Sequence, residues 1–149
     1  MPSTHLSLSY HFIFSTKNRE PLIANAWRAE LHRYFGGCIR EAGAVCLEIG
    51  GTADHVHIFA ALKATHCVAN FMRDIKRATS AWIHETFEVP RFAWQEGYGA
   101  FSVSMSNVTA VKHYIEHQAE HQAKHSFEDE FVSLLRKCNM AYDPQFVFG

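Results

Sequence analysis

The sequence predicts a single α+β domain in which an antiparallel sheet carries two helices on one face, the split β-α-β or ferredoxin-like arrangement. Two observations support this fold class. Segments with apolar residues at every second position, typical of strands, alternate with segments whose apolar residues recur every three or four positions, typical of helices. Their order is β-α-β-β-α-β followed by further helices, as in this fold. A length of 149 residues suits one domain covering 1–149.

Alternating segments predict four strands, over residues 6–14, 44–49, 55–62 and 100–106. The stretch "GGTAD" between the second and third strands is typical of a hairpin turn. Helical periodicity covers residues 24–42, 66–87 and about 108–124. Ser126, followed three positions later by Asp129, is typical of a helix N-terminus and predicts a short last helix through about residue 138.

Each expected strand has one strongly apolar face, which the two helices would cover. In the first strand Phe12 and Phe14 alternate with His11, and in the fourth Phe101 and Val103 are assigned to the covered face. A functional site is expected on the opposite, open face, with the third helix near it. The small or polar residues expected on that face are His11, Glu48, His55, His57, Ser102 and Ser104.

Composition narrows the class of protein. Hydrophobic residues make up 48% and charged residues 19%, an ordinary globular balance, and the net charge of −1 gives no global sign of nucleic-acid binding. No stretch approaches the roughly 20 apolar residues of a membrane helix. The four cysteines show no paired spacing, which is typical of reduced thiols, so a cytoplasmic protein without a signal peptide is expected.

His55 and His57 lie two positions apart on the expected third strand, so both imidazoles point to the same face. With a third ligand from elsewhere in the chain they could hold a divalent metal ion. The pattern is not specific in a chain with eleven histidines. On its own it favours two partly exposed strand histidines.

The stretch "KHYIEHQAEHQAKH", residues 112–125, has two interleaved helical spacings. Four histidines recur every four positions, and a second line borders the apolar face and holds Tyr114, Gln118 and Gln122. The histidines are either a metal-binding stripe or a solvated face, and the spacing favours the solvated face for His113, His117 and His125. His121, two turns from Tyr114, roughly shares its direction. Spacing alone makes Tyr114 a boundary aromatic with its hydroxyl in water.

Basic residues gather after the first strand and around the second helix. They form either solvated flanks or an edge that contacts phosphates. The candidates for DNA binding are Lys17, Arg19, Lys63, Arg73, Lys76 and Arg77.

In this order the motifs resemble the single-tyrosine HUH transposases of the simplest bacterial insertion sequences, a group that includes the REP-associated tyrosine transposases. The resemblance covers about residues 5–145 and rests on five stretches: "YHFIFSTKNREP", "DHVHIF", "FMRDIKRATSAW", "WQEGYGAFSVS" and "VKHYIEHQAEH". It implies a homodimeric, metal-dependent transposase that acts on single-stranded DNA with hairpin ends. Such an enzyme would be cytoplasmic, associated with the nucleoid when bound to DNA, and not with a membrane.

The resemblance also implies residue roles. His55 and His57 match the two histidines of the HUH motif, with Gln118 as the third metal ligand and Tyr114 as the catalytic tyrosine. A bound Mg²⁺ or Mn²⁺ would polarise the scissile phosphate. Tyr114 would attack phosphorus, release a 3′-hydroxyl and form a 5′-phosphotyrosine.

Two further residues have alternative roles. His121 is a second candidate for the third metal ligand. Glu48 is expected roughly opposite His57, where it could orient that imidazole. Tyr114 could act in its own chain's site or in a partner's. The alternative functions are a domesticated relative that nicks repeated hairpins, and a non-catalytic ferredoxin-like module that binds nucleic acid.

Overall fold

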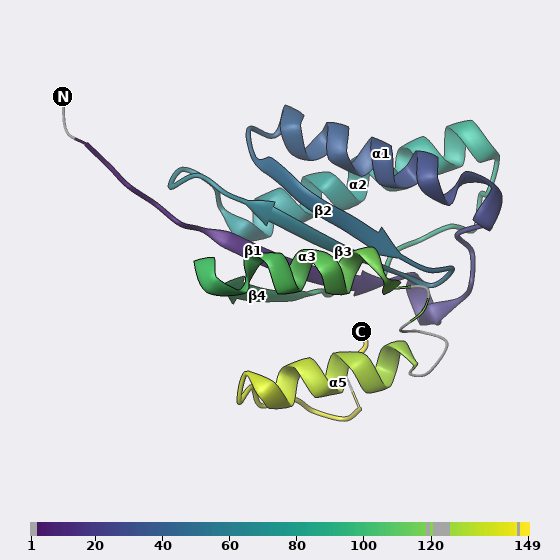
Figure 1. Ribbon diagram of the computed structural model, residues 1–149. Coiled ribbons are helices and arrows are strands. Elements are labelled where there is room, and N and C mark those ends of the chain that lie inside the picture. Colours follow the sequence, from purple (N-terminus) through teal and green to yellow (C-terminus); the bar gives the residue numbers. More distant parts are fainter. Residues whose placement is uncertain (1–2, 119, 121–125, 146) are drawn as a thin grey trace.

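One antiparallel sheet of four strands, in the order β2-β3-β1-β4, organises the chain (Figure 1). The computed structural model describes residues 3–118, 120, 126–145 and 147–149. The strands are β1 (Ser9–Ser15), β2 (Val45–Gly51), β3 (His55–Ala61) and β4 (Gly99–Val103). The helices are α1 (Asn25–Glu41), α2 (Val68–Phe87), α3 (Val108–Glu116) and α5 (Phe127–Lys137), with short 3-10 helices η1 (Lys17–Arg19) and η2 (Met105–Asn107). The split β-α-β fold class is therefore confirmed.

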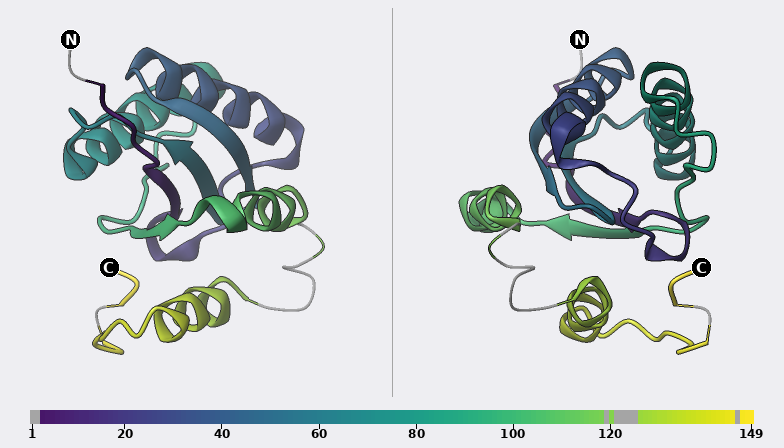
Figure 2. Two further views of the ribbon diagram at one scale, coloured as in Figure 1. Left: turned by 60° about the vertical axis from the view of Figure 1, so that its left-hand side comes forward. Right: turned by 90° about the vertical axis from the view of Figure 1, so that its right-hand side faces the viewer.

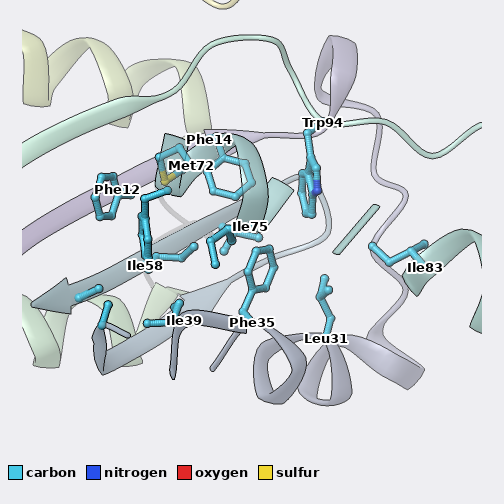
Figure 3. Close-up of a cluster of buried hydrophobic side chains, with 14 of the residues drawn as sticks. Phe12, Phe14, Leu31, Phe35, Ile39, Ile58, Met72, Ile75, Ile83 and Trp94 are labelled. Carbon is cyan, nitrogen blue, oxygen red and sulfur yellow. The ribbon is translucent and has the colours of Figure 1, made fainter. Parts of the chain in front are cut away.

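The main hydrophobic core lies between the sheet and the helices α1 and α2 (Figure 3). The strand residues Phe12, Phe14 and Ile58 face these helices because alternate side chains of a strand share a face. Helix residues at three- and four-residue spacing meet them, among them Leu31, Phe35, Ile39, Phe71, Met72 and Ile75. This core fixes the sheet, and with it the direction of every side chain on the other face.

The opposite face of the sheet carries α3 and α5 (Figure 2). Two glycines allow their close approach. A Cβ atom at Gly50 would lie 2.1 Å from the carbonyl oxygen of Ile115 in α3, and one at Gly99 would lie 2.7 Å from the ring of Phe131 in α5. Any side chain at Gly50 would push α3 off the sheet, so this position requires glycine.

The face assigned to β4 was wrong. Phe101 lies opposite His11 in the β1–β4 ladder, and Ala100 lies opposite Phe12. Directly paired residues share a face, so Phe101 belongs to the histidine-bearing face, where it packs with Phe131, and Ser102 lies on the α1 and α2 side. Alternation misled here because the large Phe101 packs with Phe131 of α5, while the small Ala100 packs against the main core.

Some element boundaries also differ from expectation. β4 ends at Val103, before η2, so Ser104 is outside the strand, and α2 begins at Val68 rather than at residue 66. α3 ends at Glu116, and much of the remaining predicted span, 119 and 121–124, lies outside the described residues. The last helix is confirmed, since Ser126 Oγ accepts the backbone N–H of Asp129 at 3.2 Å. Within the described part of the chain, no helix is both long enough and apolar enough to cross a membrane.

Candidate active site

His55 and His57 project together from β3 onto the face that carries α3 and α5. Both side chains are fully buried, at 0% exposure, whereas the pattern alone favoured partial exposure. The intervening Val56 belongs to the main core. Strand alternation therefore places one residue in the core while holding two imidazoles side by side on the other face, their ring centres 5.2 Å apart.

Asp54 holds the imidazole of His55 in a defined orientation. Its Oδ1 lies 2.8 Å from His55 Nδ1 and also accepts the hydroxyl of Thr52 at 3.2 Å. Burial would raise the pKa of Asp54, but its hydrogen bonds, first of all from His55, leave that pKa below its usual range. An ionised Asp54 fixes the proton of His55 on Nδ1, which leaves the Nε2 lone pair available to a metal ion.

His57 is oriented by a second histidine. His11 Nε2 lies 2.7 Å from His57 Nδ1, and the two rings stack with centres 4.9 Å apart. Burial and the neighbouring His57 lower the pKa of His11 to about 3, against a weaker opposing effect of Glu130, so His11 is neutral at ordinary pH. The other nitrogen of His57, Nε2, lies 2.8 Å from Glu130 Oε1.

Tyr114 and Gln118 come to this histidine pair from α3 and the residues just after it. The Tyr114 ring packs against His57, with centres 5.8 Å apart. Gln118 is buried, its Oε1 lies 3.2 Å from His55 Nε2, and its Nε2 donates to the Tyr114 carbonyl at 3.3 Å. Tyr114 therefore places its ring on His57, and Gln118, two residues past the end of α3, places its amide oxygen on His55.

Glu130, on α5, completes the cluster and was not anticipated from the sequence. Its side chain is buried, and it accepts hydrogen bonds from Tyr114 and from His57. Burial would raise its pKa, but the bonds from His57 and Tyr114 prevail and lower it to about 2. Burial and the adjacent Glu130 carboxylate in turn raise the pKa of Tyr114 well above its usual range.

The donor set fits a divalent metal ion. Ligand atoms of His55, His57 and Glu130 all lie within 4.8 Å of one another, and these residues are all buried. The Gln118 amide oxygen faces the same His55 nitrogen. Two imidazoles with a carboxylate and an amide form a mixed nitrogen and oxygen site, which suits Mn²⁺ and admits Mg²⁺.

Glu48 and His113 do not join this cluster. Gly50, not Glu48, lies opposite His57, so the predicted position of Glu48 was wrong. The pairing that starts at the turn, with Gly51 opposite Val56, places Glu48 opposite Phe59, and the Glu48 carboxylate accepts the N–H of Ile49 instead. His121 and His125 lie outside the described residues. His113 is exposed on α3, where its ligand atom lies within 4.8 Å of those of Glu116 and His117, so the solvated face stays a prediction.

The basic candidates divide into separate groups. Arg73, Lys76 and Arg77 line one cleft beside α2, on the helix-covered side of the sheet. The Lys76 ammonium already donates hydrogen bonds to the backbone carbonyls of Gln95, Glu96 and Gly97 at 2.6–3.1 Å. Arg19 forms an ion pair with Glu128 of α5. Lys17 and Lys63 are exposed.

Known proteins share both the sequence pattern and the fold. The model of the family described as "Transposase IS200 like" matches residues 4–118. A protein from Deinococcus radiodurans R1, described as a candidate transposase, has a TM-score of 0.65 and 21% identity over 79% of this chain and 95% of its own. A REP-associated tyrosine transposase bound to a REP hairpin has a TM-score of 0.59 and 13% identity, covering 85% of this chain and 74% of its own. Among curated proteins no match is found.

Proposed function

The chain belongs to the IS200-like transposase family, and from that premise we propose that it cleaves and rejoins single-stranded DNA with Tyr114 as the nucleophile. The observation that carries the proposal is the contact of Tyr114 with a buried group of metal-ligand side chains. Tyr114 packs on His57, and Glu130 accepts a hydrogen bond from its hydroxyl. A boundary tyrosine with a purely structural role has no need of such neighbours.

The metal ion is assigned to His55, His57 and Gln118, with Glu130 as a further donor that the family match does not provide. When bound, Mg²⁺ or Mn²⁺ supplies Lewis-acid stabilisation of charge on the scissile phosphate. Asp54 and His11 keep the two imidazoles in the orientation that presents Nε2 to the site. The imidazoles and carboxylates of the site come from three strands and helices and one turn, so the site forms only in the folded chain. They are His11 of β1, Asp54 of the turn before β3, His55 and His57 of β3, and Glu130 of α5.

The chain's own part in the chemistry is to place Tyr114. Glu130, ionised over the working pH range because its pKa is about 2, accepts a hydrogen bond from the Tyr114 hydroxyl and so orients its oxygen. In the cleavage step Tyr114 Oη bonds to phosphorus and the bond from phosphorus to the 3′-oxygen breaks. The proton lost from the Tyr114 hydroxyl is balanced by one gained by the leaving 3′-oxygen, which departs as a 3′-hydroxyl. Rejoining is the reverse reaction with another 3′-hydroxyl, so it requires no nucleotide cofactor.

Tyr114 is proposed to act in the site of its own chain. The tyrosine, both histidines, Gln118 and Glu130 meet within one chain. The homodimer expected from the family resemblance stays a prediction, and in this proposal a dimer would serve to pair two DNA ends. A mixture of Tyr114→Phe and His57→Gln chains tests the arrangement. Action in the same chain predicts no recovery of cleavage in the mixture, whereas action on the partner's site predicts recovery.

A DNA hairpin is the proposed partner, since one structural relative was bound to a REP hairpin. The cleft that Arg73 and Arg77 line beside α2 is the candidate phosphate-contacting surface. Arg73 is exposed and forms an ion pair with Asp74 at 3.0 Å, so Arg77 is the stronger candidate of the two for contacting a phosphate. A domesticated hairpin-nicking enzyme would use the same site, and the DNA flanking the gene distinguishes it from a mobile element.

Incubation with single-stranded hairpin DNA and Mn²⁺ or Mg²⁺ tests the proposed function. A covalent protein–DNA adduct is expected, and it should disappear with a chelator and in His57→Gln. Binding of the hairpin without an adduct under any metal condition would instead support the non-catalytic binding module.

A further inference from the structure

A cavity of about 630 Å³ opens beside Tyr114, between β4, α3 and α5. Its volume lies within the usual range of small-ligand sites, about 300–1,000 Å³. Its apolar walls are formed mainly by Phe101, Val103, Ala110, Val111 and Leu134. Polar groups at its margin include the amide of Asn107 and the hydroxyl of Ser133.

We propose that this cavity binds the base of the nucleotide whose 5′-phosphate Tyr114 attacks. The inference rests on the proposed function and adds a base-binding subsite to it. The cavity reaches Tyr114, His11 and Glu130, so it is continuous with the site of cleavage rather than a separate groove.

The lining suits a planar base better than a phosphate. The ring of Phe101 and the aliphatic side chains of Val111 and Leu134 can contact the two faces of a base. Asn107 and Ser133 can each donate and accept a hydrogen bond at its edge. The acidic Asp129 and Glu130 outnumber Lys137 among the lining residues, so the cavity has no net positive charge to attract phosphate.

The choice of nucleotide follows from the chemistry at Tyr114. The nucleotide on the 3′ side of the scissile phosphate stays linked to Tyr114 from cleavage until rejoining, whereas the 3′-hydroxyl strand leaves and is replaced. Tyr114 itself lines the cavity, while His55 and Gln118 do not. A subsite on the Tyr114 side therefore holds the retained nucleotide.

Deoxynucleoside 5′-monophosphates are direct probes, because each is this nucleotide in free form. Backbone NMR resonances of the full chain are followed during titration with the four mononucleotides and with deoxyribose 5-phosphate, which lacks the base. Ala110→Trp, an exposed α3 position that lines the cavity, should fill it. Thr109→Trp is the matched control, since its neighbouring α3 position is exposed and does not line the cavity.

The expected result is base-dependent chemical-shift changes at Val103, Val111 and Ser133. The mononucleotide affinity derived from them should be unchanged in Thr109→Trp and about tenfold lower in Ala110→Trp. Equal shifts with deoxyribose 5-phosphate, shifts confined to α2, or no shift at millimolar mononucleotide would overturn the inference. Adduct formation with hairpin DNA is measured in parallel. If mononucleotides bind here but no adduct forms, the proposed function fails alone; if adducts form equally in Ala110→Trp, the subsite fails alone.

Discussion

The Tyr114 hydroxyl donates a hydrogen bond to the carboxylate of Glu130, which lies sixteen positions later in the chain on a different helix. The same carboxylate oxygen lies 2.8 Å from His57 Nε2. α5 therefore belongs to the site, because one of its side chains joins the candidate nucleophile to a candidate metal ligand. Without α5, Tyr114 would stay on α3 but lose the carboxylate that accepts the hydrogen bond of its hydroxyl.

Glu130→Gln removes the negative charge but keeps the shape and an acceptor oxygen. The pKa of Tyr114 should fall, because burial is the largest cause that raises this pKa and the Glu130 carboxylate is the next. Affinity for Mn²⁺ should fall at least about tenfold. Ultraviolet titration of tyrosinate, with Tyr114→Phe to identify the signal, and metal-dependent thermal shift measure the two effects. The control is Glu128→Gln, two positions earlier on α5, where the side chain pairs with Arg19 and should change neither quantity. An unaltered metal affinity in Glu130→Gln would remove Glu130 from the donor set.

Asp54→Asn should weaken metal binding without altering the fold. The carboxylate that fixes the proton of His55 on Nδ1 becomes an amide, which can no longer impose that tautomer. Metal affinity should fall about 10–100-fold, measured by calorimetry with Mn²⁺. Asp74→Asn, at an exposed position on α2, is the control. Equal affinities for the two variants would show that Asp54 does not orient the ligand.

Stability should decline in mild acid partly because of His11. Its folded-state pKa of about 3 lies below the ordinary value of 6.5, so the unfolded chain binds the proton first. The contribution is complete above pH 6.5 and is lost progressively as the pH falls toward about 3. Between about pH 7.5 and 5, wild-type unfolding free energy should drop about 2 kcal/mol more than that of His11→Gln.

Urea unfolding at a series of pH values measures this difference. His113→Gln is the matched control, because His113 is exposed on α3. Parallel stability curves for wild type and His11→Gln would contradict a neutral, buried His11.

Gly50→Ala should displace α3 from the sheet, because the new methyl group would meet the Ile115 carbonyl. Unfolding free energy should fall by about 1–3 kcal/mol, and metal affinity should fall with it, since α3 leads to Gln118. Gly37→Ala is the control: no atom within 4 Å would meet its Cβ, and alanine in helix α1 should stabilise by up to about 1 kcal/mol. Chemical denaturation distinguishes the two, and equal stability would mean that α3 does not depend on Gly50.

The sheet and the histidine pair could be predicted because they follow from local periodicity. Alternation in β3 places His55 and His57 on one face whatever lies above it, and one helical turn relates Tyr114 to Gln118. The faces of β4 could not be predicted this way, since Phe101 is covered by α5, an element far along the chain. Glu48 was misplaced because alternation assigns a residue to a face but does not fix where the turn ends, and the turn sets the register that pairs Gly50 with His57.

Glu130 had a signal that periodicity could have revealed. It lies on the buried stripe of α5, between Phe127, Phe131 and Leu135 at helical spacing. A lone carboxylate on an apolar stripe needs a buried partner. Which partner it meets depends on how α5 packs against the sheet, and that packing is a long-range property.

The most direct test of the central claim is to identify the residue that bonds to DNA. Wild-type protein is incubated with single-stranded hairpin DNA and Mn²⁺, the adduct is digested with protease and nuclease, and the modified peptide is sequenced by mass spectrometry. The nucleotide should be found on Tyr114, with no adduct from Tyr114→Phe and a normal adduct from Tyr98→Phe. A nucleotide on any other residue, or an adduct that persists in Tyr114→Phe, would contradict the assignment of Tyr114 as the nucleophile.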